Sequence, residues 1–400
     1  MIPMAKLITI ETRKAEGAWA FLELGFRPFF LGAAGYAVLS VFIWMGVYLF
    51  GWPLRLGGLT PMTWHAHEMI YGYTMAVIAG FLLTAIRNWT DRPTPSGAPL
   101  LLLFLLWAAG RIILLLGGAA LLPLAAAADA LFILALLVSA ARPVAQAGQW
   151  EQLGILSILT LLLAGNLTFY LGALHLLPNG VSLGLYSGLY LILALVFKMA
   201  RRVIPTFIER GAGAPVHLKN RRWVDYSSLG FFLLFAIADL ANPNGALAAL
   251  LAGLLVVLHT IRLAGWHTPG IWRTPLLWVL YLAYGSLVIG FALKVAAVVL
   301  GLSPYLAVHA FTVGGIGMMT LGMMARVSLG HTGRNVLNPP EGVFWMCGAL
   351  FIAAIVRVLF PLANPSHFAL WIGLSQAFWI VAFGLFLSVY APILVRQGVE

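Results

Sequence analysis

The stretch that decides the fold is APLLLLFLLWAAGRIILLLGGA at residues 98–119, where Arg111 is the only charged side chain. A helix needs about 20 predominantly apolar residues to cross a bilayer, so this stretch is long and apolar enough to do so. Similar runs centre on residues 29–50, 66–86, 121–141, 152–174, 183–204, 226–243, 245–264, 275–300, 305–329, 343–362 and 368–394. The sequence therefore predicts an all-α polytopic membrane helix bundle of about twelve transmembrane helices.

The composition also indicates that lipid is the main solvent. Apolar residues make up 62% of the 400 residues and charged residues only 9%, whereas a soluble domain carries roughly 25% charged residues. The net charge of +11 would suggest a nucleic-acid partner for a soluble protein, but the charge lies in short connections and no nucleic-acid motif is present. A single cysteine, Cys347, excludes an intrachain disulfide and argues against a cysteine-based metal cluster. We therefore expect the lipid bilayer, and no nucleic acid, as a partner.

Lysine and arginine alternate between the two sides of the predicted membrane. The connections expected in the cytoplasm carry Arg87, Arg92 and the basic group at 198–222, whereas the outer connections carry Arg55 and almost no other basic residue. Positive charge in cytoplasmic loops is the rule for multi-pass proteins. A missed helix would invert the pattern downstream, so the alternation supports twelve helices with both termini in the cytoplasm.

We predict a single integral membrane domain over residues 1–400. Residues 1–28 have no continuous apolar core, so they do not resemble a cleaved signal peptide, and a cytoplasmic interfacial N-terminus is expected. The longest polar connection, residues 205–225, is expected to be a cytoplasmic loop with a strong stop signal. A linker between two six-helix halves is the alternative.

The second and tenth runs share a faint pattern. His67, Gly72 and Gly80 match the His, Gly and Gly at positions 309, 314 and 322, an offset of 242 residues. Three four-helix pseudo-repeats would explain these matches. So few matches also arise by chance, and the sequence alone does not separate the two explanations.

Two histidines and a glutamate adjoin at the start of the second run, in Trp64-His-Ala-His-Glu-Met69. Residues two apart on a helix face opposite sides, so His65 and His67 do not easily bind one metal from a regular helix. Glu68 is expected to lie nearer the His65 face and to orient an imidazole. Interfacial side chains satisfied by headgroups are the alternative. Because ionisable groups at membrane depth are expensive, we favour a functional site.

His309, at the start of the tenth run, shares the outer leaflet with the histidines of the second run in this topology. Two neutral imidazoles on facing helices are the usual axial ligands of a b-type haem in a helical bundle. The attachment sequence Cys-x-x-Cys-His is absent, so any haem is non-covalent. We therefore predict His309, with His65 or His67, as ligands of haem b.

Other residues of this region have a predicted role beside such a haem. Gly314 belongs to a glycine-rich helix against which a macrocycle would fit, although close helix packing is the commoner reason for such glycines. Arg55 lies on the outer side, where haem propionates need a cation, whereas Arg87 and Arg326 lie on the opposite side. Asp129 is expected to pair with a nearby arginine, at position 111, across adjacent helices.

Copper ligands are a further possibility on the tenth run. The run contains the methionines Met318, Met319, Met323 and Met324. Their thioethers would be ligands for Cu(I), although packing is the commoner role of a methionine-rich membrane helix. His331-Thr-Gly-Arg334 lies just beyond the inner end of this run. That motif has three interpretations: a second polar metal site, a contact to lipid phosphate or a simple helix cap.

Four stretches together resemble the NnrS family. They are Gly25-Phe-Arg-Pro-Phe-Phe30, Trp64-His-Ala-His-Glu-Met-Ile-Tyr-Gly-Tyr73, Arg201-Arg-Val-Ile-Pro-Thr-Phe207 and the segment from His309 to Arg334. The resemblance covers nearly the whole chain. It implies a bacterial inner-membrane protein with haem and copper, associated with the nitric oxide response and denitrification, for which nitric oxide is a ligand or substrate.

The same resemblance carries the family's motif histidines over to His65, His67, His309 and His331. The chain departs from the histidines expected in relatives where it reads Asn166-Leu-Thr-Phe-Tyr170 and Trp278-Val-Leu-Tyr281, because neither stretch contains one. Metal ligands at those two places are therefore not expected here.

The chain is also similar, more distantly, to the catalytic subunits of haem-copper oxidases. Those subunits have twelve helices in three four-helix units and hold a haem by histidines of the second and tenth helices. The sixth and seventh runs here contain no histidine, so a complete binuclear site is not expected. A haem protein of nitric oxide tolerance is the leading hypothesis. A nitric oxide- or quinone-linked oxidoreductase and a secondary transporter are the alternatives, and whether the protein is an enzyme is left open.

Overall fold

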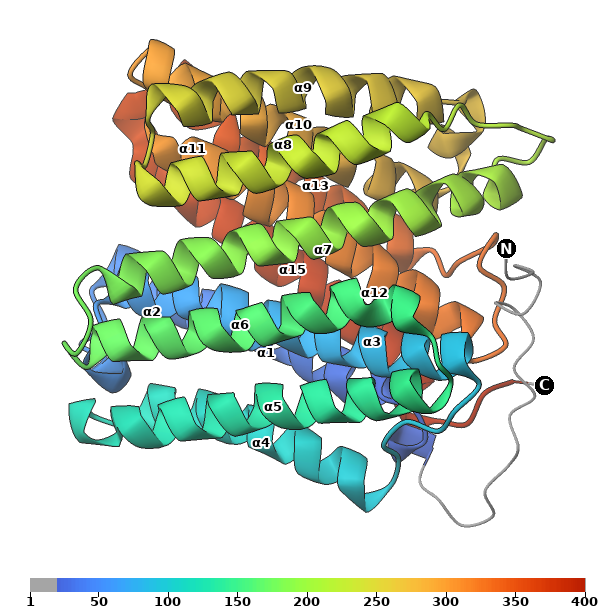
Figure 1. Cartoon of the computed structure of the whole chain (residues 1–400), viewed down its shortest axis with the longest axis horizontal. Coiled ribbons are helices and arrows are strands. Elements are labelled where there is room, and N and C mark those ends of the chain that lie inside the picture. The colour runs from blue at the N-terminus through green and yellow to red at the C-terminus, as the bar shows by residue number, and fades with distance from the viewer. Residues whose placement is uncertain (1–19, 400) are drawn as a thin grey trace. The chain divides into compact units, whose positions relative to one another are not determined.

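A computed structural model of the chain describes residues 20–399, with helices as its regular structure (Figure 1). Twelve spans among these residues are long and apolar enough to cross a membrane, which confirms the predicted fold class. Residues 1–19 of the predicted interfacial segment 1–28 lie outside the described part of the chain. The first half of the spans is formed by α1 (Phe26–Phe50), α2 (Pro61–His67) continuing into α3 (Met75–Thr90), α4 (Ala98–Leu116), α5 (Leu122–Gln146), α6 (Leu153–Ala173) and α7 (Gly180–Gly211).

The remaining spans follow the predicted runs equally well. They are α8 (Arg222–Ala241), α9 (Ala246–Trp266), α10 (Pro275–Val299), α11 (Pro304–His309) continuing into α12 (Met318–Gly330), α13 (Gly342–Val358) with the short α14 (Phe360–Ala363), and α15 (Phe368–Val395). The predicted cytoplasmic loop at 205–225 is shorter than expected. Helix α7 continues through Pro205 because Ile204 and Ile208 stay buried on its packed face, so only residues 212–221 are irregular.

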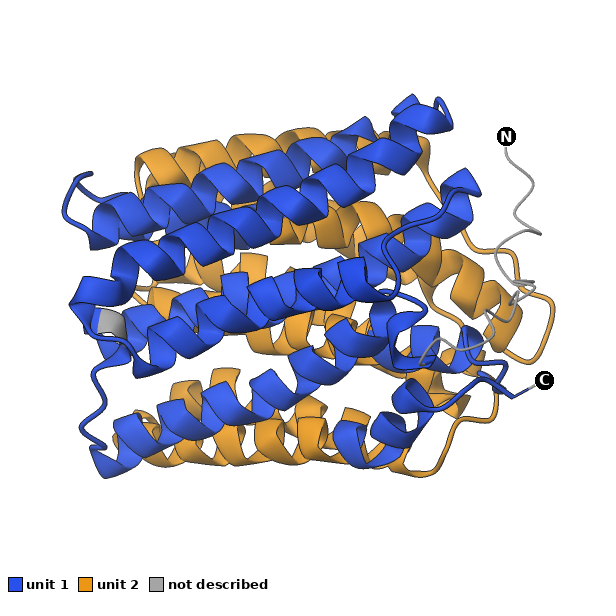
Figure 2. Cartoon of the chain, turned by 90° about the horizontal axis from the view of Figure 1, so that it is seen from below, with its two compact units in different colours: residues 1–191, 324–336, 386–400 blue, residues 192–323, 337–385 orange. Residues whose placement is uncertain are grey.

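The chain forms two compact units, which Figure 2 shows in separate colours. Unit 1 comprises residues 1–191, 324–336 and 386–400, and unit 2 comprises residues 192–323 and 337–385. Three of the boundaries fall inside helices α7, α12 and α15. The division therefore does not follow the polar connection at 205–225 that was considered as a linker between two halves.

In unit 1, helices α4 and α5 pack side by side (Figure 1). Gly117 and Gly118 separate them, and Pro123 lies in the first turn of α5, where the missing N–H costs no helical hydrogen bond. Leu102 on the outer face of α4 is 61% exposed. An exposed leucine side chain suits contact with lipid. The helix itself is also compatible with lipid, because its backbone polar groups are hydrogen-bonded within the helix.

The Gly25–Phe30 motif ties the start of α1 to other elements of unit 1. Arg27 donates from Nη1 to the carbonyl oxygen of Leu394 at 3.0 Å and to that of Arg396 at 2.5 Å. A cation at the C-terminal end of α15 compensates the unsatisfied carbonyls and the negative end of the helix dipole. The backbone N–H of Phe26 donates to Oγ1 of Thr84 at 3.2 Å. The motif therefore has a structural role in the described chain.

The second and tenth spans are the most enclosed of the twelve. For each span we take an 18-residue apolar window and the share of its residues that is buried. This share is 83% in span Pro61–Thr90 and 72% in span Pro304–Gly330, and at most 56% in the other spans. The two spans with the predicted site histidines therefore have the surroundings of a buried site and not of a lipid-facing helix.

Candidate functional site

A π-helical segment begins directly after His67 and again directly after His309. In unit 1, α2 ends at His67 and the π segment Glu68–Thr74 follows; in unit 2, α11 ends at His309 and the π segment Ala310–Gly317 follows. The two segments start 242 residues apart, the same offset as the sequence matches. π-helical turns are rare and occur frequently at functional sites. The correspondence between the two spans thus extends from a few residues to the local backbone geometry.

In unit 1, Glu68 is the centre of a buried network of charged side chains. Its Oε1 accepts from Nη1 of Arg111 at 2.9 Å and lies 2.9 Å from Nδ1 of His67, and its Oε2 accepts from the hydroxyl of Tyr36. His67 and Glu68 are both completely buried. The side chain of Glu68 contacts the imidazole of His67 directly, so within this network Glu68 orients His67.

The same arginine joins Glu68 to a second carboxylate. Nη2 of Arg111 donates to Oδ1 of Asp129, and the hydroxyl of Tyr170 donates to Oδ2 of Asp129 at 2.7 Å. This contact confirms the predicted pairing of Arg111 with Asp129 across α4 and α5. Every carboxylate oxygen of Glu68 and Asp129 therefore has a donor, which is the condition under which buried charges are tolerated.

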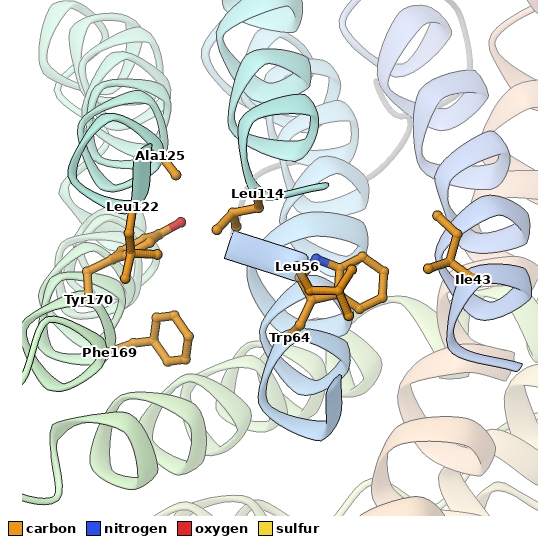
Figure 3. Close-up of a cluster of buried hydrophobic side chains, with 8 residues drawn as sticks. All are labelled: Ile43, Leu56, Trp64, Leu114, Leu122, Ala125, Phe169 and Tyr170. Atoms are coloured by element: carbon orange, nitrogen blue, oxygen red, sulfur yellow. The ribbon is translucent and has the colours of Figure 1, made fainter. Parts of the chain in front are cut away.

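His67 is held on both ring nitrogens. Its Nε2 lies 3.0 Å from Oδ1 of Asn166, opposite the Glu68 contact on Nδ1, and its ring stacks on Phe169 at 4.3 Å between centroids. Figure 3 shows Phe169 and Tyr170 in the adjoining buried cluster with Trp64. Asn166 begins one of the two stretches in which relatives were expected to carry a histidine. In this structure no ring nitrogen of His67 is left for a metal unless Glu68 or Asn166 moves.

His65 faces a different neighbour. Its ring is parallel to that of Trp44, with the planes inclined by 9° and the centroids 4.9 Å apart. His65 is only partly buried, whereas His67 is completely buried. The two histidines therefore point away from each other, as predicted for residues two apart.

In unit 2, His309 has a defined tautomer. Its Nδ1 lies 2.7 Å from the carbonyl oxygen of Tyr305, and its Nε2 lies 3.2 Å from Nη2 of Arg357. A carbonyl oxygen only accepts and a guanidinium only donates, so Nδ1 carries the proton and Nε2 presents its lone pair. This is the form in which a histidine binds a metal through Nε2 while its other nitrogen is oriented by a hydrogen bond.

An arginine of the following span meets the start of the π segment in each unit. Arg111 on α4 contacts Glu68, the first residue of the π segment in unit 1. Arg357 on α13 contacts His309, the last residue before the π segment in unit 2. The two arrangements differ in their consequence, because His67 is enclosed by side chains on both nitrogens whereas His309 presents one nitrogen to a cation.

The glycines of the tenth span serve packing between helices. A Cβ on Gly314 would lie 2.6 Å from Cβ of Ser286, and a Cβ on Gly315 would lie 2.1 Å from Leu287. Neighbouring helices of unit 2 therefore occupy the space that a macrocycle would need beside Gly314. This result favours the packing interpretation, so Gly314 is not one of the residues of the proposed haem site.

Two other predicted residues lie in unit 1 at separate places. Arg55 is exposed just before a short 3-10 turn, next in sequence to Leu56 of the buried cluster in Figure 3. The ring of His331 lies 5.7 Å from that of Phe26, and burial together with the charge of Arg87 lowers its pKa to about 4. Over residues 20–399, no three His, Cys, Asp or Glu side chains are grouped as a metal site requires.

A second polar network, in unit 2, was not predicted from the sequence. Nη1 of Arg262 and Nδ1 of His259 both contact the hydroxyl of Tyr284, at 2.8 and 2.6 Å. His259 is 1% exposed and stacks on Phe197. The sequence contained one indication of this network, because His259 and Arg262 are three residues apart and therefore lie on one face of a helix.

The fold and these networks define a class of protein, namely a multi-pass helical membrane protein with ionisable clusters in its most enclosed spans. The NnrS family model, described as NnrS protein, matches residues 20–397, and the chain belongs to this family. Membership of this family supports the assignment of the chain as a membrane protein of the nitric oxide response. No curated protein gives a significant match to the chain.

Proposed function

We propose that the chain is a haem-binding inner-membrane protein of the nitric oxide response, in which His309 is an axial ligand of a b-type haem near the periplasmic face. The single observation that carries this proposal is the tautomer of His309. Its Nδ1–H is committed to Tyr305 at 2.7 Å and its Nε2 accepts from Arg357 at 3.2 Å, so Nε2 is the unprotonated nitrogen that would bind the iron once Arg357 is displaced.

In unit 1 we propose His65, and not His67, as a haem ligand. Glu68 and Asn166 hold the two ring nitrogens of His67 at 2.9 and 3.0 Å, so His67 belongs to the buried network. The Glu68–Arg111–Asp129 network would then act as a rigid support that fixes the span on which His65 lies.

Each residue of the proposed site has a stated task. Haem supplies, when bound, an iron atom that binds nitric oxide or exchanges one electron. His309 would be oriented by Tyr305, and Arg55, which is exposed, is the cation available to haem propionates in unit 1. Copper enters the proposal only through the family resemblance. The described residues do not group as a copper site of His, Cys, Asp and Glu ligands would, so no copper ligands are assigned.

Optical spectroscopy of the purified protein tests the proposal. Protein expressed with sufficient haem should show a Soret band that shifts when nitric oxide is added. Turnover of nitric oxide with a reductant would identify an enzyme, whereas stoichiometric binding alone would identify a sensor or scavenger. A preparation that lacks the Soret band after haem-replete expression would contradict the proposal.

A secondary transporter is the second candidate, and one observation favours it. Twelve spans in a chain of 400 residues also suit a secondary transporter. Metal analysis that finds neither haem nor copper, together with solute uptake into proteoliposomes, would reverse the order of the two candidates.

A further inference from the structure

A small pocket lies in unit 2 where α8 begins. Part of it is open to the surface, and its lining includes Lys219, Arg221, Asp225, Arg262 and Trp266. The pocket is therefore a small depression of the surface with basic side chains in its lining.

The loop that forms the pocket is fixed against the end of α9. The backbone N–H of Lys219 donates to the carbonyl oxygen of Gly265 at 3.1 Å, and Nε1 of Trp266 donates to Oδ1 of Asn220 at 3.0 Å. A Cβ on Gly265 would lie 2.7 Å from the carbonyl oxygen of Lys219, so only glycine permits this approach. The lining is therefore held in place by contacts of the protein itself.

The charge of the pocket is positive. Its only carboxylate, Asp225, is paired with Arg262 at 2.9 Å and with Arg201 at 2.6 Å. Lys219 and Arg221 are exposed and make no side-chain hydrogen bond or ion pair with any residue of the range 20–399. The first turn of α8 adds backbone N–H groups, because Arg221 at its N-cap provides no capping side chain. These features together select an anion.

The surface around the pocket points to a lipid as the source of that anion. On α8, Trp223 is 53% and Tyr226 is 78% exposed, and Leu229, Leu233 and Ile237 follow with at least half of their surface exposed. Exposed tryptophan and tyrosine mark the headgroup level of a bilayer, and the apolar residues beyond them suit acyl chains. The nearby segment 198–222 has an excess of basic residues, which favours anionic lipids.

We propose that this pocket binds the phosphate group of an anionic phospholipid. Lys219 and Arg221 contact the phosphate, Arg262 supplies the buried positive wall, and the acyl chains follow the exposed face of α8. This site is independent of the proposed haem ligands.

Thermal unfolding of the full-length protein in a neutral detergent tests the site. Short-chain phosphatidylglycerol should raise the unfolding midpoint in a saturable way, and short-chain phosphatidylcholine at the same concentration should not. The double variant Lys219→Gln/Arg221→Gln should bind phosphatidylglycerol on the order of tenfold more weakly, because two basic contacts are lost. Native mass spectrometry of the folded protein counts bound lipid directly, so a change in the stability of the variant does not obscure the result.

The charge-matched control is Arg92→Gln/Arg142→Gln, which removes two exposed basic residues from unit 1. This control should bind phosphatidylglycerol as the unmodified protein does. Equal weakening in both double variants would overturn the proposal, because binding would then follow net charge and not the pocket. Equal stabilisation by phosphatidylcholine would also overturn it. The same saturable shift with inorganic phosphate would assign the pocket to a free anion and contradict the lipid assignment.

Discussion

The Nδ1 atom of His309 lies 2.7 Å from the carbonyl oxygen of Tyr305, one turn earlier on the same span. This bond fixes the proton on Nδ1 and directs the lone pair of Nε2 towards Arg357. The corresponding histidine of unit 1, His67, has an acceptor at each ring nitrogen. Two spans with the same local backbone irregularity therefore carry histidines with different capacities for a ligand.

Arg357 occupies the nitrogen that the proposed haem needs. Replacement of Arg357 by Leu removes a charged donor to Nε2 of His309, and a hydrogen bond of this kind contributes about 1.5–3 kcal/mol. We expect Arg357→Leu to bind haem about tenfold more tightly or better when the apoprotein is titrated. Loss of haem binding in this variant would instead make Arg357 a support of the ligand.

The Arg111–Asp129 pair should contribute strongly to stability. Removing one partner of a buried ion pair leaves an uncompensated charge and costs about 3–5 kcal/mol. Asp129→Leu should therefore lower the thermal unfolding midpoint markedly, whereas Arg142→Gln, at an exposed position on the same helix, should leave it nearly unchanged. A small effect of Asp129→Leu would show that the network is not needed for the folded state.

The two histidines of the second span should have separable effects. His65→Ala should lose haem with little loss of stability. His67→Leu should lower stability, because Glu68 and Asn166 lose a buried partner, and should retain haem. The haem content and the unfolding midpoint, measured on the same preparations of each variant, show which histidine holds haem and which supports the fold. Retention of haem by His65→Ala together with its loss in His67→Leu would exchange the two roles.

Gly314 distinguishes packing from cofactor contact. A methyl group at Gly314 meets Ser286 at 2.6 Å, so Gly314→Ala should destabilise unit 2 by about 1–3 kcal/mol. Gly348→Ala is the matched control, because nothing lies within 4 Å of a Cβ at that position. Unchanged stability of Gly314→Ala with loss of haem would show that the glycine faces the cofactor after all.

Stability should depend on pH through His331. Its pKa is lowered to about 4 by burial and by the charge of Arg87, whereas an unfolded histidine titrates near 6.5. Between these values the unfolded chain binds more protons than the folded chain, so this contribution to stability is complete above about pH 6.5 and is lost as the pH falls towards 4. The unfolding midpoint should fall less between pH 7.5 and 5 in His331→Phe than in the unmodified protein.

The sequence predicted the fold well because membrane spans depend on length and apolarity alone. The predicted runs at 98–119 and 121–141 correspond to α4 and α5, and the predicted Arg111–Asp129 pair is confirmed. The contacts of Glu68 with Tyr36 and Arg111 were not predicted, because the three side chains lie on three different spans. The His259–Arg262–Tyr284 network was missed because Tyr284 joins the other two residues only after α9 and α10 pack together.

The most direct test of the central claim is the haem content of His309→Ala beside that of His367→Ala, each measured as pyridine haemochrome per mole of folded protein. His367 is an exposed histidine of unit 2, so its removal controls for the loss of any imidazole. The account predicts that His309→Ala loses its haem or shows an altered Soret band, whereas His367→Ala matches the unmodified protein. An unchanged haem content and Soret band in His309→Ala would contradict it.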